Sequence, residues 1–141
     1  MTQSWICIIF LFFVSPIYAG ELKVHFTHLK NDKGNVLYLI FNTEEGFPDK
    51  KAKSIKQGKI STKMALNEGV LFGDLPDGTY AMTAFHDQNS NDRLDTGLFG
   101  IPQEGFAFSN NPGVFFGPPS YTKSKFKLQG NKKLKLKFKY F

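Results

Sequence analysis

Side chains that carry oxygen ligands are concentrated in one stretch of the chain, residues 86–105, which we call the Asp/Asn loop. Asp87, Asn89 and Asn91 stand at every second position, and Asp95 comes four residues later. Carboxylate and amide oxygens at this spacing are ligands for a hard cation such as Ca²⁺. The chemistry that these residues suggest is therefore cation binding.

The loop follows the first nine positions of an EF-hand calcium loop counted from Asp87, with the backbone carbonyl of Arg93 at position seven. It departs from that pattern at position six, which is Asp92 in place of glycine, and at position twelve, which is Leu98 in place of glutamate. Glu104 takes the role of that glutamate only if the chain folds back. The predicted calcium ligands are Asp87, Asn89, Asn91, Arg93, Asp95 and Glu104. The alternative is a metal-free loop in which Asp and Asn side chains bond their own backbone in Asx turns.

Two other chemistries fit residues of the same stretch. His86 has the side chain of a metal ligand or an acid–base group, but His25 and His28 are distant in sequence, which favours a structural histidine. Asp87 and Glu104 form a carboxylate pair of the kind that hydrolyses glycosides. Two acids in one loop are common, so a hydrolase is the distant alternative, and we expect no enzymatic activity.

Aromatic residues are unusually numerous in the second half of the loop and after it. They are Phe99, Phe106, Phe108, Phe115, Phe116 and Tyr121. One interpretation is a small core of their own, because a long loop needs apolar burial to stay ordered. The other is a site that stacks on a small molecule or a glycan, and a concave aromatic cleft beside His86 would favour it.

The elements that position these residues are predicted to be strands, because apolar and polar side chains alternate along most of the chain. The predicted strands are residues 21–29, 35–41, 59–64, 68–72, 80–85 and two more between 126 and 140. Residues 49–58 are spaced loosely for a helical turn, and residues 96–120 read as ordered loop. Short strands with turns between them and no long helix predict an all-β fold: an antiparallel Greek-key β-sandwich of about seven strands with one long ordered loop.

The N-terminal segment carries the marks of a signal peptide. Residues 5–14 are an apolar run of the right length, and Ala19 before Gly20 is a plausible cleavage point. We expect a signal peptide over residues 1–19, a single β-sandwich domain over 20–141 and a periplasmic or secreted protein, with a retained anchor as the alternative. The only cysteine, Cys7, lies in that segment, so the mature chain would use neither disulfides nor thiol chemistry.

Charge is distributed unevenly along the 141 residues, whose formal net charge is +6. Acids predominate in residues 74–104, whereas residues 123–139 hold eight lysines and no acid. Arg93 is the only arginine, which argues against nucleic-acid binding, since arginine is the usual bidentate reader of bases and phosphates. The C-terminal lysines either bind an anionic envelope surface or protect a sheet edge against aggregation.

Four segments together resemble a known family. They are FNTEEGFPD (41–49), DLPDGTYAMTAFHDQNSNDRLDT (74–96), GIPQEGFAFSNN (100–111) and FGPPSY (116–121). They resemble the exported bacterial family called domain of unknown function 2141, although Asp92 stands where that family often has glycine. The resemblance implies a small periplasmic or secreted β-sandwich, similar to transthyretin-like and carboxypeptidase-regulatory-like domains, with no established activity. We therefore expect a non-enzymatic binding or structural module of the cell envelope.

Overall fold

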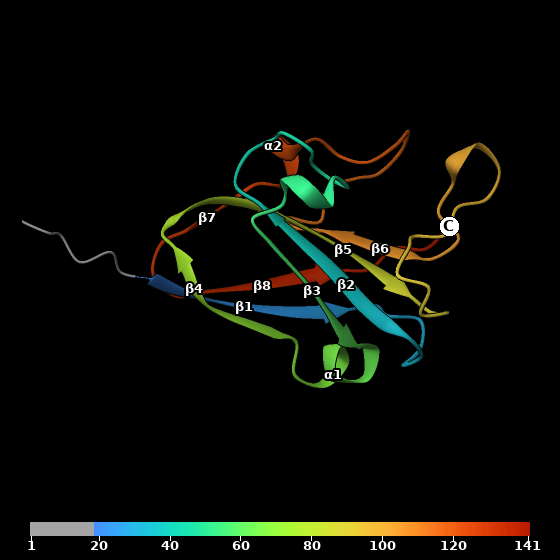
Figure 1. Ribbon diagram of the computed structural model, residues 1–141, viewed down its shortest axis with the longest axis horizontal. Helices are drawn as coiled ribbons and strands as arrows, with labels where there is room; N and C mark the ends of the chain where they lie inside the picture. The colour runs from blue at the N-terminus through green and yellow to red at the C-terminus, as the bar shows by residue number, and fades with distance from the viewer. Residues whose placement is uncertain (1–18) are drawn as a thin grey trace, which may run out of the picture.

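The computed structural model describes residues 19–141, which form two β-sheets packed face to face (Figure 1). The predicted signal peptide falls almost wholly on residues 1–18, outside the described residues, and stays a prediction. Within the described part of the chain, no helix is both long enough and apolar enough to cross a membrane.

The described residues contain eight strands and four short helices. The strands are β1 (Ala19–Thr27), β2 (Asn35–Phe41), β3 (Lys56–Ser61), β4 (Val70–Pro76), β5 (Gly78–Asp87), β6 (Gly105–Phe108), β7 (Phe126–Leu128) and β8 (Lys132–Lys137). The helices are η1 (Lys51–Lys53), α1 (Thr62–Asn67), η2 (Leu98–Gly100) and α2 (Tyr121–Ser124). The predicted all-β sandwich is confirmed.

The first sheet has the strand order β4-β1-β8, and the second has β3-β2-β5-β6 with β7 paired to the start of β5. All of these pairs are antiparallel except β1 with β8, which run parallel. Both strands of that pair begin at the same end of the sheet, where the Glu21 N–H donates to Asn131 Oδ1 over 3.2 Å. A period of two gives the face of each residue but not the direction of its strand, so the sequence does not reveal this exception.

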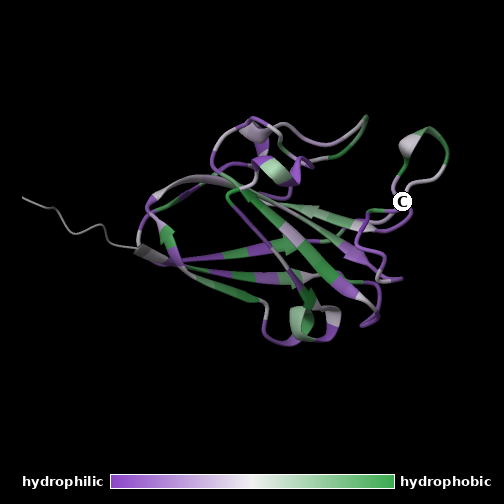
Figure 2. Cartoon of the chain, viewed as in Figure 1, coloured by the Kyte–Doolittle hydropathy of each residue, from purple (hydrophilic) through white to green (hydrophobic). Residues whose placement is uncertain are grey.

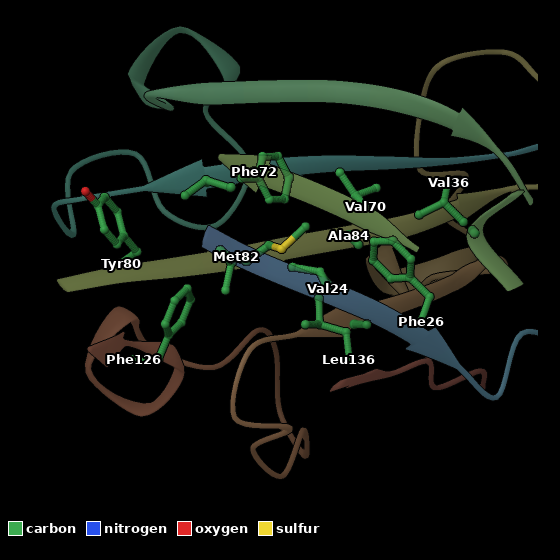
Figure 3. Close-up of a cluster of buried hydrophobic side chains, with 14 of the residues drawn as sticks. Val24, Phe26, Val36, Val70, Phe72, Tyr80, Met82, Ala84, Phe126 and Leu136 are labelled. Carbon is green, nitrogen blue, oxygen red and sulfur yellow. The ribbon is translucent and has the colours of Figure 1, made fainter. Parts of the chain in front are cut away.

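Alternate residues of the strands fill the space between the sheets, as the period of two predicts (Figure 3). β1 contributes Leu22, Val24 and Phe26, all buried, and the ring of Phe26 packs edge-on against Phe138 with centroids 6.0 Å apart. Each large apolar side chain that is fully buried stabilises the fold by about 1.5–3 kcal/mol. The sandwich is therefore a rigid support for the loops at its ends.

Helix α1 stands where the sequence suggested the end of a strand and a turn. Ser61 caps it by accepting a hydrogen bond from the Met64 N–H, and the buried Thr62 hydroxyl donates to the carbonyl of Lys33 over 2.8 Å. Gly69, with φ of +69°, follows the helix and turns the chain into β4. A capping serine and a left-handed glycine are the ordinary signals for a short helix, and here they override the alternation of residues 59–64.

The long loop predicted over residues 96–120 contains strand β6, which divides it in two. The first half ends at Glu104, and the second runs from residue 109 to α2. β6 pairs with β5 in the register Phe85↔Phe106 and Thr83↔Phe108. β6 is only four residues long, and its sequence GFAF shows no alternation of apolar and polar residues, so the sequence does not reveal it as a strand.

Candidate functional site

Asp87, the last residue of β5, organises the first half of the Asp/Asn loop. Its side chain is fully buried, with an exposed fraction of 0%. Oδ1 accepts a hydrogen bond from the Asn91 N–H at 3.0 Å, and Oδ2 accepts one from the Asp92 N–H at 2.9 Å. Asp92 has φ of +62°, a conformation that aspartate tolerates better than most residues.

Glu104, the residue before β6, holds residues 88 and 95 of the loop. It is 5% exposed, and Oε1 accepts from the Gln88 N–H at 2.8 Å while Oε2 accepts from the Asp95 N–H at 3.1 Å. The chain therefore does fold back to place Glu104 beside the start of the loop. Each of the two buried carboxylates accepts two backbone N–H groups, which replace the hydrogen bonds that water would give it.

Asp95 joins the remaining predicted ligands in one network. Its carboxylate accepts from Asn91 Nδ2 at 2.9 Å and from Asn89 Nδ2 at 2.6 Å. Those amide hydrogen bonds, the Asn91 bond first and then the Asn89 bond, lower the pKa of Asp95 below its ordinary value. The amide oxygens also accept backbone N–H groups, Asn89 from Asn91 and Asn91 from Arg93.

The structure thus brings Asp87, Asn89, Asn91, Asp95 and Glu104 into one loop network, to which Arg93 adds its backbone N–H. Within residues 19–141, no three His, Cys, Asp or Glu side chains are grouped so that they could hold a metal ion. These are the hydrogen bonds of the self-capped loop, and a calcium ion would have to replace several of them. Calcium binding stays a prediction.

His86 lies on the opposite side of β5 from the Asp/Asn network and is fully buried. Nε2 lies 2.8 Å from the carbonyl of Lys33, which can only accept, so Nε2 carries the proton. Nδ1 then accepts from the Tyr140 hydroxyl at 2.7 Å, and burial raises the pKa of that tyrosine. The prediction of a structural histidine is confirmed, because both ring nitrogens are used inside the core.

An apolar groove of about 1100 Å³ lies on the outer face of the five-stranded sheet. Strand register arranges its floor in two rows across β2, β5 and β6. The rows are Leu37–Phe85–Phe106 and Leu39–Thr83–Phe108. Thr83, the polar side chain among these six, donates its hydroxyl hydrogen to the carbonyl of Pro48 at 3.1 Å, and the rows continue onto β3 with Lys59 and Gln57 at the edge of the groove. The floor therefore presents carbon to the groove.

Two loops form the walls of the groove, and we call them the wall loops: residues 93–102 and residues 112–118. The first precedes β6 and the second lies between β6 and α2, and both carry apolar residues at their tips (Figures 1 and 2). Phe99 of the first is 97% exposed and Phe115 of the second is 84% exposed. The first wall loop is the distal part of the Asp/Asn loop, so the carboxylate network holds one wall of the groove in place.

One part of the predicted aromatic cluster packs around Phe47, and the other part is exposed. The ring of Phe47 packs against Phe41, Phe108 and Tyr121 with centroids 5.5–6.2 Å apart. For Phe106, which is buried and packs against Phe108, and for Phe108 and Tyr121, the prediction of a small aromatic core is confirmed. It is wrong for Phe99, Phe115 and Phe116, which are exposed.

The cleft that would favour a ligand site lies not beside the His86 side chain but on the other side of its strand. Phe85 points outward into the groove and His86 points inward, because neighbouring residues of a strand face opposite ways. Neither Asp87 nor Glu104 lines the groove, and the carboxylate oxygens of both accept hydrogen bonds from backbone N–H groups of the loop. The carboxylate pair is therefore placed to hold the loop rather than to face a ligand in the groove.

Charged side chains stand at the rim of the groove. Three are cationic and two are acidic: Lys51, Lys59, Arg93, Asp49 and Asp92. Lys59 forms an ion pair with Asp92 at 2.9 Å, whereas the Arg93 guanidinium forms no ion pair with any residue in 19–141. The rim therefore keeps an excess of positive charge beside an apolar floor.

Sequence reasoning missed the floor residues Leu37 and Leu39 and the C-terminal Phe141, which also lines the groove. The predicted strand over residues 35–41, NVLYLIF, is apolar on both of its faces. Apolar residues on both faces of a strand indicate that its outer face is either covered or part of an apolar groove. This pattern was the signal from which the groove could have been predicted.

Comparison with known proteins adds one finding. Searches among curated proteins and among solved structures returned no match. A protein-family model does match, over residues 24–136, which spans β1 to β8 and includes the Asp/Asn loop and both wall loops. The chain therefore belongs to the family described as uncharacterized protein conserved in bacteria, DUF2141.

Proposed function

We propose that this protein is an exported, non-enzymatic binding module that holds an anionic amphiphile in the groove of its five-stranded sheet. The observation that carries the proposal is the groove itself, about 1100 Å³ with a floor of five apolar side chains and one threonine. Ligand sites in proteins are concave, mostly apolar and roughly 300–1,000 Å³ in volume. The groove has the size and the lining of such a site.

The chemistry of the floor favours an apolar ligand over a glycan. Sugars need hydrogen-bond partners as well as rings to stack on, and the one hydroxyl of the floor, on Thr83, is already bonded to Pro48. The exposed rings of Phe99 and Phe115 gain most from an apolar partner, since covering a phenylalanine side chain is worth about 1.5–3 kcal/mol. A glycan stays the alternative ligand.

The charge of the rim favours an anionic head group. Lys51, Lys59 and Arg93 outnumber Asp49 and Asp92, and Arg93 forms no ion pair within residues 19–141. A guanidinium at the edge of an apolar site is suited to a carboxylate or a phosphate, which it binds with two parallel hydrogen bonds. The head group would lie at the Arg93 end of the groove and the apolar part along the floor.

Export belongs to the proposal because it rests on the sequence. The apolar run of residues 5–14 and the Ala19–Gly20 junction support cleavage and a periplasmic or secreted location. The likeness to transthyretin-like and carboxypeptidase-regulatory-like domains, which the sequence segments suggest, is consistent with a two-sheet sandwich whose loops carry the site. Calcium binding by the Asp/Asn loop is a separate proposal, which would stiffen one wall of the groove.

The test is displacement of the fluorescent probe 1-anilinonaphthalene-8-sulfonate by palmitate from the protein, residues 20–141. We expect the probe to bind the wild type and palmitate to displace it. Leu39→Lys and Phe85→Glu place a charge on the floor and should weaken palmitate binding by tenfold or more, on the order of 1.4 kcal/mol. Leu71→Lys is the matched control, because Leu71 is an exposed leucine on the other sheet.

Equal palmitate affinity in the two floor variants and the control would contradict the proposal. Binding of maltohexaose that the floor variants abolish, with no response to palmitate, would replace it with the glycan alternative. Arg93→Gln tests the head group: it should weaken palmitate but leave its uncharged alcohol, hexadecanol, unaffected.

A further inference from the structure

The outer face of the three-stranded sheet is basic, and we call it the lysine face: Lys23, His25, Lys133, Lys135 and Lys137. The parallel register places Lys23 beside Lys133 and His25 beside Lys135. Hydrophilic and hydrophobic residues alternate along both β1 and β8, so the buried residues between them, such as Val24 and Leu136, point into the core (Figure 2). The positive groups therefore share one open surface.

One acid, Glu21, alternates onto the same outer face of β1 as Lys23, but it forms no ion pair with a lysine of that face. The ion pairs among the described residues join Lys53 to Glu45, Lys56 to Asp74 and Lys59 to Asp92, and none involves the lysines of β1 or β8. Like charges opposed on neighbouring strands are unfavourable. Lys23 beside Lys133 is such a pair. The arrangement therefore destabilises the sheet unless a bound anionic partner offsets the repulsion.

Protection of the β8 edge does not account for the arrangement. The side chain of Asn111 already covers that edge, since Nδ2 donates to the Lys135 carbonyl at 2.9 Å and Oδ1 accepts from the Lys137 N–H at 2.7 Å. Lys23 lies on β1, the central strand of its sheet, which is paired on both sides. A lysine there guards no free edge.

We propose that the lysine face docks the protein on a bilayer surface that contains anionic phospholipids. Lysine side chains act as point charges that attract phosphate head groups without needing fixed geometry, as juxtamembrane basic segments do. Leu71, next to Lys23 on β4, is 52% exposed and offers an apolar group that a bilayer can bury and a nucleic acid cannot use. The occupant that fits both the charge and Leu71 is a lipid surface.

This inference is independent of the proposed function. The lysine face and the groove lie on the outer faces of different sheets of one sandwich. A protein docked through the lysine face therefore leaves its groove open to the solvent. Loss of vesicle binding with palmitate binding intact would contradict only the proposed membrane docking. Loss of palmitate binding with vesicle binding intact would contradict only the proposed function of the groove.

The test is sedimentation of residues 20–141 with vesicles of phosphatidylcholine alone and of phosphatidylcholine mixed with phosphatidylglycerol. We expect binding to the mixed vesicles only, weakened when salt rises from about 0.05 to about 0.5 M. The triple variant Lys133→Gln, Lys135→Gln, Lys137→Gln should bind about a hundredfold more weakly, given the usual contribution of one lysine near such a surface.

The matched control carries the same loss of net charge at three exposed lysines outside the three-stranded sheet, Lys50→Gln, Lys125→Gln and Lys127→Gln, and should retain most of the binding. Circular dichroism melts of both variants show whether either has lost its fold, and Lys23→Gln alone serves as a milder change on the same face. Equal weakening by the two triple variants, equal binding to neutral vesicles, or tighter binding to a duplex DNA of random sequence than to the mixed vesicles at equal salt would overturn the proposal.

Discussion

At the scale of single residues, Asp87 and Glu104 share one role from the two ends of the Asp/Asn loop. Each buried carboxylate binds two backbone N–H groups, and together they fix residues 88–95 against the end of the sandwich. Phe99 and Ile101, which line the groove, follow directly from this anchored segment. Asp87 and Glu104 therefore affect ligand binding indirectly, because they fix the position of the first wall loop.

Calcium binding by the loop is tested by melts of the wild type, Asp87→Asn and Asp95→Asn in chelator and in millimolar Ca²⁺. If the ion binds, it replaces the amide donors around Asp95 and cancels the repulsion between carboxylates. A site with a Kd of about 10⁻⁴–10⁻³ M is typical of extracellular modules. At a hundredfold excess the ion adds about 2.7 kcal/mol, or several degrees of Tm. The prediction requires a rise that both variants lose; identical melts in calcium and chelator would leave the self-capped loop.

The lowered pKa of Asp95 predicts how acid affects the loop. Because the amides of Asn91 and Asn89 favour the charged carboxylate in the folded state, its contribution to stability is complete above the ordinary value of about 3.9 and is lost as pH falls through the lowered pKa. The gap in urea midpoint between the wild type and Asp95→Asn should be constant from neutral pH to about pH 5 and should close below about pH 4. A gap that does not change with pH would show that the charge of Asp95 has no part in holding the loop.

At the scale of elements, β5 connects the core to the candidate site. Its inward residues, such as Met82 and His86, are buried, and its outward residues Thr83 and Phe85 form the middle of the groove floor. One strand thus fixes the floor and, through Asp87 at its end, one wall. The floor of the groove is therefore a rigid sheet, and its first wall loop is held by the hydrogen bonds of the Asp/Asn loop.

Asn111 provides a prediction about the edge of β8. Its side chain exchanges two hydrogen bonds with the backbone at Lys135 and Lys137, as a neighbouring strand would. Its φ of +48° suits glycine, so Asn111→Gly removes the side chain without straining the backbone. Unfolding in urea should show a loss of about 1–2 kcal/mol, since each hydrogen bond contributes roughly 0.5–1.5 kcal/mol. Unchanged stability would mean that water replaces Asn111 at no cost.

Much of the fold could be predicted from the sequence, because alternation places Leu22, Val24 and Phe26 in the core without reference to any partner strand. The parallel pairing of β1 with β8 could not, since it depends on where two distant segments meet. The six residues of the Asp/Asn network were predicted as calcium ligands, which stays a prediction, and bonding to their own backbone was the alternative. Which N–H groups each carboxylate binds could not be predicted, because backbone donors leave no mark in a sequence. The groove was missed because its floor combines residues from three strands, whose neighbours only the register defines.

At the scale of the whole molecule, the two outer faces of the sandwich differ in chemistry. The three-stranded sheet presents lysines to the solvent, and the five-stranded sheet presents the apolar groove between the wall loops. Most of the acids lie in loops and at strand ends, whereas Glu21 of β1 shares the lysine face with Lys23. This division gives one protein a surface for docking and, separately, a site for a ligand.

The central claim is that an apolar ligand lies on the floor of the groove, and methyl-labelled NMR measures this directly. Titration of residues 20–141 with palmitate should shift the methyl signals of Leu37 and Leu39, which lie in neighbouring rows of the floor. Leu71 on the other sheet and Leu136 in the core should not move. Saturating shifts confined to Leu37, Leu39 and the wall loops are the predicted result. Shifts at Leu71 alone, or uniform small shifts without saturation, would contradict the account.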